Sequence, residues 1–275
     1  MYPLRQREFK LFSKLIYEKS GIRLNDGKSE LVRTRLSKRL RKLGIPTFKE
    51  YYQLLSNHPR DPEVFNMLDA ITTNKTSFFR EPQHFNFINK TVLPKLLKEK
   101  EKTGDRVFRI WSAGCSTGEE PYSLAITLLE FLENHPGYKI KILGTDISNQ
   151  ALNFAIRGIY EKTRITDISF DLFRKYFLRG ENKWRRFYMV KPELSKIVCF
   201  KHVNLVNDDF SFPSSFDIIL CRNVMIYFDQ NTQEKVIEKC HSILNSGQYF
   251  FIGHSESLVG IKHRFQYVQP TIYRK

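Results

Sequence analysis

The sequence predicts an α/β protein. A small all-α N-terminal domain precedes a mostly parallel sheet with helices on both faces and a small antiparallel β insertion. Residues 1–72 contain amphipathic helix patterns and no strand pattern. From about Phe85 helix and strand patterns alternate, which is typical of a parallel sheet. At about 178–202 two β-rich runs flank a turn and interrupt this alternation, which indicates the antiparallel insertion.

The composition indicates a folded protein with a strong positive charge. Of the 275 residues, 41% are hydrophobic and 14% aromatic, which provides for a core and argues against disorder. The net charge of +16 predicts an acidic partner: nucleic acid, an anionic surface or an acidic protein. The four cysteines form no Cys-x-x-Cys pair, and no signal peptide or long apolar run is evident. We therefore expect a cytoplasmic protein with reduced thiols and no membrane insertion.

Four helices are predicted in the N-terminal domain, 1–72, from their start and stop signals. The first ends at Gly21, and the second covers about Lys28–Leu43. Thr47 begins a capping box for the third helix, and Asp61 caps the fourth. The residues expected to face inward from the fourth helix are Val64, Phe65, Leu68 and Ile71.

The second of these helices is strongly basic on its outer faces. Its only acidic residue is Glu30, and its basic residues are Arg33, Arg35, Lys38, Arg39, Arg41 and Lys42. Because nearly all the charges have one sign, ion pairs within the helix do not account for them. We expect this helix to dock an acidic partner, and the alternative is an ordinary solvated face.

Residues 73–90 are the predicted linker between this domain and the larger one, 91–275. The linker starts with polar residues and has no regular periodicity before Phe85. Phe78 and Phe79 stand beside polar residues, which leaves two interpretations. The linker is either a connector pinned by these two rings or a loop folded over a ligand.

The most informative stretch is a strand, a glycine turn and a helix start. Val107–Trp111 is rich in β-formers, Gly114 and Gly118 permit a tight turn, and Glu119-Glu120-Pro121 begins a helix. Such units usually hold a nucleotide-like ligand. There is no Gly-Lys-Ser/Thr and no Gly-x-Gly-x-x-Gly, and two carboxylates at the helix start would repel phosphate. They suit a cationic ligand such as S-adenosylmethionine, and the alternative is a purely structural turn.

The remaining strands place further polar residues at their carboxyl ends, where open α/β sheets bind ligands. Asp146 ends one strand, in the position from which an acid holds ribose hydroxyls in dinucleotide folds, and Arg222-Asn223 ends another. The other predicted elements are helix 85–102, helix 119–133, strand 139–145, helix 149–156, helix 169–176, strand 216–221, helix 232–244, strand 249–252 and two closing strands, 265–268 and 271–273.

Taken together, these motifs resemble the chemotaxis receptor glutamate methyltransferases, the CheR family. The matching segments lie in order over nearly the whole chain. They are Thr73-Asn-Lys-Thr-Ser-Phe-Phe-Arg80, Ala113-Gly-Cys-Ser-Thr-Gly-Glu-Glu-Pro-Tyr-Ser123, Gly144-Thr-Asp-Ile147, Gly158-Ile-Tyr160, Asn204-Leu205, Phe216-Asp-Ile-Ile-Leu-Cys-Arg-Asn-Val-Met-Ile-Tyr-Phe228 and Gly253-His-Ser-Glu256. The resemblance implies a Rossmann-like methyltransferase domain that depends on S-adenosylmethionine and methylates glutamates on the cytoplasmic helices of chemoreceptors.

The resemblance also implies roles for individual residues. Arg80 and Tyr227 would position the substrate carboxylate. Either Glu119 or Glu120, with Glu120 preferred, would meet the methionine end or the adjoining ribose, and Asp146 would hold adenosine hydroxyls. The residues implied to bind S-adenosylmethionine, and its product S-adenosylhomocysteine, are Asn74, Thr76, Arg80, Gly114, Glu120, Asp146, Asn204, Leu205, Arg222 and Asn223.

The implied chemistry needs neither a general base nor a metal. A glutamate side chain, with a reference pKa of about 4.3, is already ionised at neutral pH. Alignment and desolvation of the carboxylate against a sulfonium are then the main tasks of the enzyme. We expect His84, His202 and His254 to be structural, or to contact residues of the site without touching the ligand themselves.

One segment departs from the family pattern. Members that bind a receptor C-terminal pentapeptide use a glycine-containing turn in the insertion, and here that turn reads Glu181-Asn-Lys-Trp-Arg-Arg186, after Gly180. The resemblance therefore leaves binding of such a peptide open.

Two other functions are compatible with the fold. A methyltransferase acting on nucleic acid or another acidic partner would agree with the charge. However, there is no Asn/Asp-Pro-Pro-aromatic motif at Arg222-Asn223 and no Pro-Cys nucleophile. A non-catalytic module that only binds S-adenosylmethionine is the other alternative, and the acids, Arg80 and Tyr227 argue against it.

Overall fold

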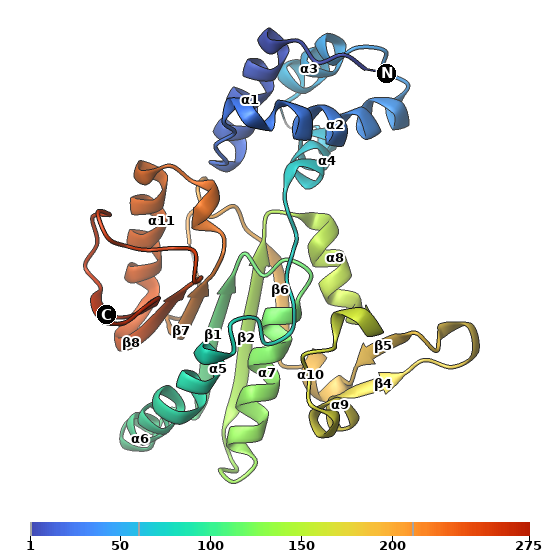
Figure 1. The fold of residues 1–275 in the computed structure, drawn as a ribbon. Helices are drawn as coiled ribbons and strands as arrows, with labels where there is room; N and C mark the ends of the chain where they lie inside the picture. Colours follow the sequence, from blue (N-terminus) through green and yellow to red (C-terminus); the bar gives the residue numbers. More distant parts are fainter. Residues whose placement is uncertain (1, 60, 211) are drawn as a thin grey trace.

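The computed structural model describes residues 2–59, 61–210 and 212–275. Its N-terminal part is a four-helix domain that stands over one end of the larger sheet domain (Figure 1). The predicted signals are present: Gly21 is left-handed after the first helix, and the hydroxyl of Thr47 and the carboxylate of Asp61 accept backbone N–H groups. The helices are α1 (Gln6–Ser20), α2 (Ser29–Leu43), α3 (Phe48–Asn57) and α4 (Pro62–Ile71).

The inward face of α4 differs from the prediction at one position. Phe65 is 42% exposed, whereas Met67 is fully buried in the core of the helical domain. The ring of Phe65 packs edge-on against His202 of the larger domain, with ring centroids 5.6 Å apart. The inward assignment of Phe65 is therefore wrong, because its ring covers part of the contact between the domains.

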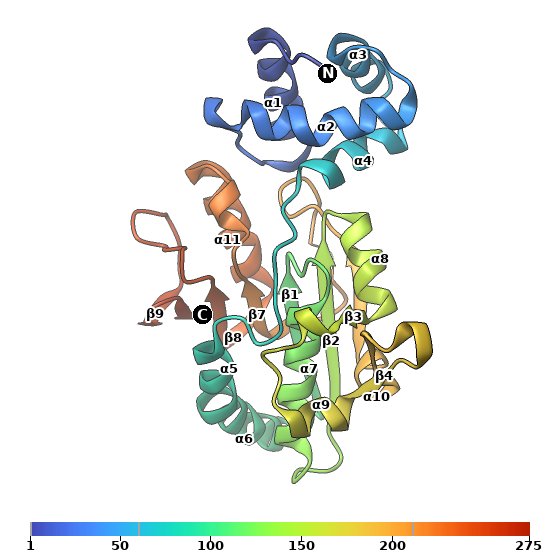
Figure 2. The same cartoon turned by 45° about the vertical axis from the view of Figure 1, so that its right-hand side comes forward.

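The larger domain is built on a seven-stranded sheet in the order β6-β2-β1-β7-β8-β10-β9. The first five strands of this order are parallel, and β10 is antiparallel to both of its neighbours. The strands are β1 (Val107–Ala113), β2 (Lys139–Asp146), β6 (Val198–His202), β7 (Phe216–Cys221), β8 (Leu244–Ile252), β9 (Gln266–Gln269) and β10 (Ile272–Arg274). The carboxyl ends of the parallel strands point toward the helical domain (Figures 1 and 2).

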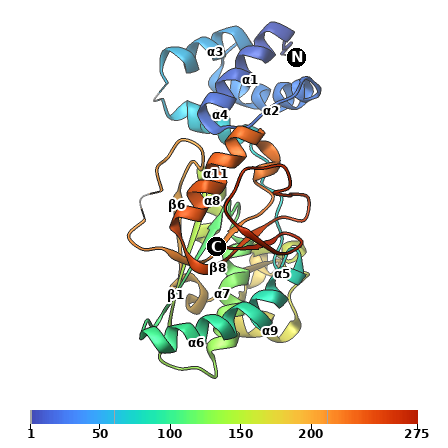
Figure 3. The same cartoon turned by 90° about the vertical axis from the view of Figure 1, so that its left-hand side faces the viewer.

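Both faces of the sheet are covered, which explains the continuous apolar runs of the central strands. Along β7, Ile218 and Leu220 pack into one hydrophobic cluster, while Ile219 and Cys221 pack into another. Figure 3 shows α11 over one face and α6 and α7 over the other. The flanking helices are α5 (Pro82–Phe87), α6 (Leu93–Thr103), α7 (Glu119–Leu132), α8 (Asn149–Arg157) and α11 (Gln230–Ile243).

The linker crosses the carboxyl ends of the strands before α5. Phe78 is fully buried, and its ring packs edge-on against Tyr160 and Phe177, with centroids 5.0 and 5.5 Å away. The predicted helix 85–102 is α5 and α6 joined by a π-helical turn, Ile88–Val92. Phe78 therefore anchors the linker in the core of the sheet domain.

The antiparallel insertion is present, but its predicted bounds of 178–202 are wrong. Its three strands, β3 (Ile159–Glu161), β4 (Phe177–Arg179) and β5 (Phe187–Val190), pair in the order β3-β5-β4. The second predicted β-rich run is β6, which pairs in parallel with β2 at the edge of the main sheet. Short helices α9 (Phe170–Tyr176) and α10 (Pro192–Ser195) complete the region. No helix in the described ranges has the length and apolar composition needed to cross a membrane.

Candidate active site

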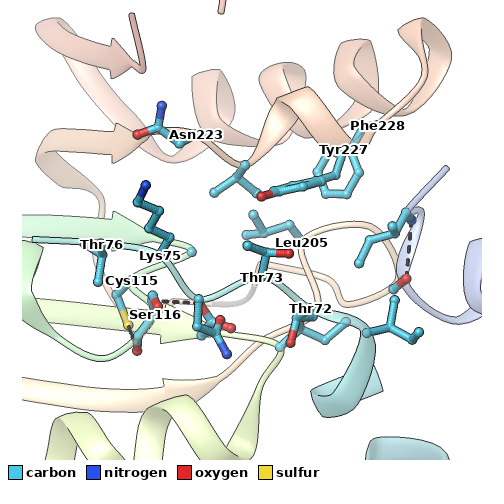
Figure 4. A pocket seen from close by; sticks show the side chains of 18 of the residues that line it. Thr72, Thr73, Lys75, Thr76, Cys115, Ser116, Leu205, Asn223, Tyr227 and Phe228 are labelled. Atoms are coloured by element: carbon cyan, nitrogen blue, oxygen red, sulfur yellow. Dashed lines mark hydrogen bonds between the residues drawn. The ribbon is translucent and has the colours of Figure 1, made fainter. Parts of the chain in front are cut away.

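One pocket lies between the helical domain, the linker and the carboxyl ends of the strands, and it encloses about 1220 Å³ of empty space, part of it open to solvent. All residues that the sequence assigned to the cofactor or to catalysis line this pocket. They are Asn74, Thr76, Arg80, Gly114, Glu120, Asp146, Asn204, Leu205, Arg222, Asn223 and Tyr227. Figure 4 shows Lys75, Asn223, Tyr227 and Leu205 surrounding the same space.

The glycine turn after β1 forms one side of the pocket. Gly114 has a φ of 75°, and a Cβ added there would come within 2.3 Å of Val224 Cγ2. The N–H groups of Gly114 and Cys115 both donate to the carbonyl of Thr145, at 2.7 and 2.8 Å. A larger residue at position 114 would therefore displace the segment that follows β7.

Asp146, at the end of β2, is held by the backbone. Its carboxylate accepts the N–H groups of Ser116 and Ser148, at 2.8 and 2.9 Å. Burial raises the pKa of Asp146, and these hydrogen bonds oppose that rise. The neighbouring Ser116 hydroxyl is buried without a hydrogen-bond partner in the described part of the chain. It lines the pocket and is available to a ligand.

The two adjacent acids at the start of α7 face different surroundings. Glu120 lines the pocket, accepts the Ser112 hydroxyl at 2.6 Å and pairs with Arg222 at 3.1 Å. Glu119 is fully buried and pairs instead with Arg164 at 3.0 Å. Burial raises the pKa of both carboxyls. Glu120 is thus the acid that faces the pocket, whereas Glu119 connects α7 to the insertion.

Arg222 is the centre of a buried ionic network that was not predicted from the sequence. Its guanidinium, 1% exposed, pairs with Glu120 and Glu81 and donates to the carbonyl of Arg80. Burial alone would raise the pKa of Glu81, but Arg222 and the N–H of His254 hold it below its ordinary value. Glu81 was missed, although Glu81-Pro82 repeats the acid-proline helix start of Glu120-Pro121.

Glu256 is a second acid that sequence analysis left without a role. Its carboxylate accepts the N–H groups of Asn223 and Met225, both at 2.8 Å, and those of Gly253 and Ile226. These bonds hold Asn223 at a φ of 58°, just before the 3₁₀ turn that ends at Tyr227. The sequence feature that could have pointed to Glu256 is the Gly253-His-Ser-Glu256 motif, which follows a strand.

The helical domain also contributes to the pocket, although none of its residues was assigned to the cofactor or to catalysis from the sequence. The amide of Asn204 donates to the carbonyl of Lys19 at 2.6 Å, and the N–H of Arg23 donates to the carbonyl of Tyr227 at 2.8 Å. The side chain of Asn204 therefore joins the domains, although the residue lines the pocket. The lining residues from the helical domain are Ser20, Ile22, Arg23, Leu24, Lys28, Leu31, Ile71 and Thr72.

Four basic residues on the pocket lining form what we call the cationic wall: Arg23, Lys28, Lys75 and Arg80. None of them forms an ion pair with an acid within residues 2–59, 61–210 and 212–275. Among the described residues, the side chain of Arg80 donates only to the carbonyl of Lys75, at 3.0 Å. Positive charge that no direct ion pair neutralises therefore faces the pocket, next to Glu120 and Asp146.

The basic helix α2 uses half of its predicted docking residues inside its own domain. Arg39 pairs with Glu63, and Arg33 pairs with Glu30 one turn earlier in the helix. Arg35 donates to the carbonyls of Ile71 and Thr72 at the end of α4. Of these contacts, the Arg33–Glu30 pair alone lies within the helix, so an ion pair within α2 accounts for one of the six basic residues. The remaining three, Lys38, Arg41 and Lys42, are exposed.

Comparison with known proteins agrees with this site. Residues 74–274 match the family described as "CheR methyltransferase, SAM binding domain", and residues 7–72 match "CheR methyltransferase, all-alpha domain". A chemotaxis protein methyltransferase of Borreliella burgdorferi is 41% identical over 95% of this chain and 92% of its own length. One from Escherichia coli is 37% identical over 98% of this chain and 91% of its own length. A probable chemotaxis protein methyltransferase of Rhizobium etli is 40% identical over 94% of this chain and 96% of its own length.

The pocket fits the cofactor that the family description names. The backbone of Gly114 lines the pocket without a side chain, the Ser116 hydroxyl has no partner among the described residues, and Glu120 and Asp146 present carboxylates. These groups suit the hydroxyls and positive charge of S-adenosylmethionine, which has no phosphate. With both of its domains matched and relatives aligned over nearly its full length, the chain belongs to the CheR family of S-adenosylmethionine-dependent methyltransferases.

Proposed function

We propose that this enzyme transfers the methyl group of S-adenosylmethionine to glutamate side chains on the cytoplasmic helices of chemoreceptors, for chemotactic adaptation. The observation that carries the proposal is the pairing of two environments in one pocket. Buried acids face the part suited to a cationic cofactor, and the cationic wall lies beside them without acidic partners in the described ranges. A ligand carboxylate would supply the missing negative charge. The names of the relatives indicate a chemotaxis substrate.

The residues of the pocket have separate tasks in this proposal. Bound S-adenosylmethionine supplies an electrophilic methyl group. Glu120 and Asp146 hold the cofactor, with Asn74, Thr76, Gly114, Leu205, Arg222 and Asn223 shaping its site. Arg80 and Tyr227 orient the substrate carboxylate, which is ionised at neutral pH and needs no base. Because other residues bind the cofactor, Arg80 and Tyr227 are free to align the substrate carboxylate with the methyl group.

Receptor docking is proposed for domain 1–72, with 73–90 as the linker over the cofactor and 91–275 as the catalytic domain. Lys38, Arg41 and Lys42 remain exposed on α2, so they can meet an acidic helical surface. Arg33, Arg35 and Arg39 support this surface from within the domain. The four free cysteines agree with a cytoplasmic location, which we also propose.

The insertion offers a second receptor contact. Met189 lies opposite Ile159 in one strand pair and opposite Leu178 in the other, so the three side chains share one face. They are 40 to 43% exposed. We propose that this sheet contributes to receptor binding and takes up a receptor C-terminal peptide, if one is used. Such a peptide added in excess would then compete with intact receptor.

Methylation of receptor fragments tests the proposed reaction. Enzyme, labelled methyl donor and receptor cytoplasmic fragments should give base-labile label, which is typical of a glutamate methyl ester. Fragments with glutamine at the candidate glutamates serve as the matched control and should remain unlabelled. Label on nucleic acid would instead indicate a nucleic-acid methyltransferase. Cofactor binding without any transfer would indicate a non-catalytic module.

A further inference from the structure

Glu81, His84 and His254 lie together behind the pocket, between the start of α5 and the loop after β8. Their possible ligand atoms lie within 4.8 Å of one another. Glu81 Oε2 lies 3.5 Å from His84 Nδ1 and 4.0 Å from His254 Nε2. None of the three lines the pocket. They are thus a separate cluster, connected to the site through the contact of Glu81 with Arg222.

The hydrogen bonds around His84 define which of its ring nitrogens is free. The Thr271 hydroxyl donates to the carbonyl of Pro270 at 2.6 Å and lies 2.7 Å from His84 Nε2. Because a hydroxyl has one hydrogen, Nε2 is the donor to Thr271, and in the neutral ring Nδ1 then carries the lone pair. Nδ1 is buried and has no hydrogen-bond partner in the described chain. An unshared lone pair thus faces a carboxylate oxygen, which is unfavourable without a cation between them.

We propose that Glu81, His84 and His254 bind a divalent transition-metal ion of the zinc class. One carboxylate oxygen and two imidazole nitrogens are typical ligands for such an ion, with a fourth position left to water. Ligand bonds of about 2.0–2.2 Å place tetrahedral ligand atoms roughly 3.4 Å apart. The distance from Glu81 to His84 matches this spacing, and the exposed ring of His254 would move inward to reach it. The bond from His84 Nε2 to Thr271 fixes the ring that presents Nδ1 to the metal.

Charge near the cluster sets the expected strength of binding. Arg222 also pairs with Glu81, and its positive charge would repel a metal ion there. Glu120 pairs with the same guanidinium and balances part of that charge. We therefore expect micromolar affinity, weaker than that of a closed four-ligand structural site. His254 is 46% exposed, so the ion has a route from solvent. The ion would fasten the loop after β8 to the linker next to Arg80.

Metal titration of the untagged, full-length chain tests this site. After chelator treatment, calorimetry with Zn²⁺ should give one equivalent bound, and Co²⁺ should give the visible absorption of a four-coordinate site. His254→Ala should weaken zinc binding at least tenfold. His58→Ala, at an exposed histidine on the helical domain, is the matched control and should bind like the wild type.

Thermal melts provide a second readout of the same variants. Zinc should raise the Tm of the wild type and of His58→Ala but not that of His254→Ala. A ligand that binds the folded state raises its stability, and the folded state of His254→Ala lacks one of the zinc ligands. The proposal is overturned if the wild type binds no zinc at one equivalent, or if His254→Ala binds it equally well. Binding of S-adenosylhomocysteine in chelator tests the cofactor pocket independently.

Discussion

The two sides of the pocket differ in how their charges are balanced. On the sheet wall, which we define as Gly114, Glu120, Asp146 and Arg222, each charged side chain is buried or half-buried and has a fixed partner. On the cationic wall, Arg23, Lys28 and Lys75 are exposed, Arg80 is half-buried, and none has an acidic partner among the described residues. Glu120, Asp146 and Arg222 are therefore held in place before any ligand arrives, whereas the four cations remain available for a direct ion pair with a ligand.

This difference separates stability from activity. Removing one partner of a buried ion pair leaves an uncompensated charge and destabilises the fold. Removing an exposed charge without a partner changes folding little. We therefore expect substitutions on the sheet wall to reduce stability or cofactor binding, and substitutions on the cationic wall to reduce turnover or substrate binding.

The largest expected effect is the loss of stability in Arg222→Met. Glu81 and Glu120 would remain buried without their cation, which costs about 3–5 kcal/mol of unfolding free energy. Arg80→Met applies the same substitution to the cationic wall and should change stability by about 0.5 kcal/mol or less. Urea denaturation of both variants measures the difference. Equal losses in the two variants would contradict the distinction between the walls.

Asp146→Ala should weaken binding of S-adenosylhomocysteine. A lost hydrogen bond to a charged group costs about 1.5–3 kcal/mol, or about 10- to 150-fold in Kd. Lys75→Ala is the control from the cationic wall and should change that Kd less than about threefold. Calorimetry with S-adenosylhomocysteine measures both, and an unchanged Kd for Asp146→Ala would remove this residue from the cofactor site.

Arg80→Ala should lower turnover about tenfold at saturating donor and receptor, since it removes a charged contact to the attacking carboxylate. Tyr227→Phe removes only a hydroxyl and should cost about 2- to 10-fold. Initial rates of receptor methylation measure both effects, with binding of S-adenosylhomocysteine as the control. If Arg80→Ala loses cofactor affinity and keeps its turnover, Arg80 serves the cofactor and not the substrate.

The smallest expected effect concerns docking. Lys38→Glu with Arg41→Glu should raise the KM for receptor about 2- to 5-fold at low salt, because exposed charges contribute about 0.2–1 kcal/mol each. Added salt should reduce the difference by screening. Lys98→Glu with Lys102→Glu, at exposed positions on α6, is the matched control. A KM that rises equally in both double variants would indicate a general effect of net charge.

Much of the site could be predicted because it depends on short segments and on one rule of topology. Capping by Thr47 and Ser148 and the left-handed Gly21 are local, so the sequence places these helix ends closely. Parallel strands bring their carboxyl ends to one edge of the sheet, which collects Gly114, Asp146 and Arg222. The same rule places the glycine turn after β1 beside Asp146, the last residue of β2.

The sequence by itself therefore determined the succession of helices and strands outside the insertion, and the edge of the sheet where the pocket lies. Only the tertiary structure decided which partner each side chain takes. In the folded chain Arg39 pairs with Glu63, and the amide of Asn204 donates to the carbonyl of Lys19. The segment Val198–His202 lies at the edge of the main sheet. These contacts join residues distant in the chain, and their geometry follows from how whole elements pack, which no local propensity or spacing specifies.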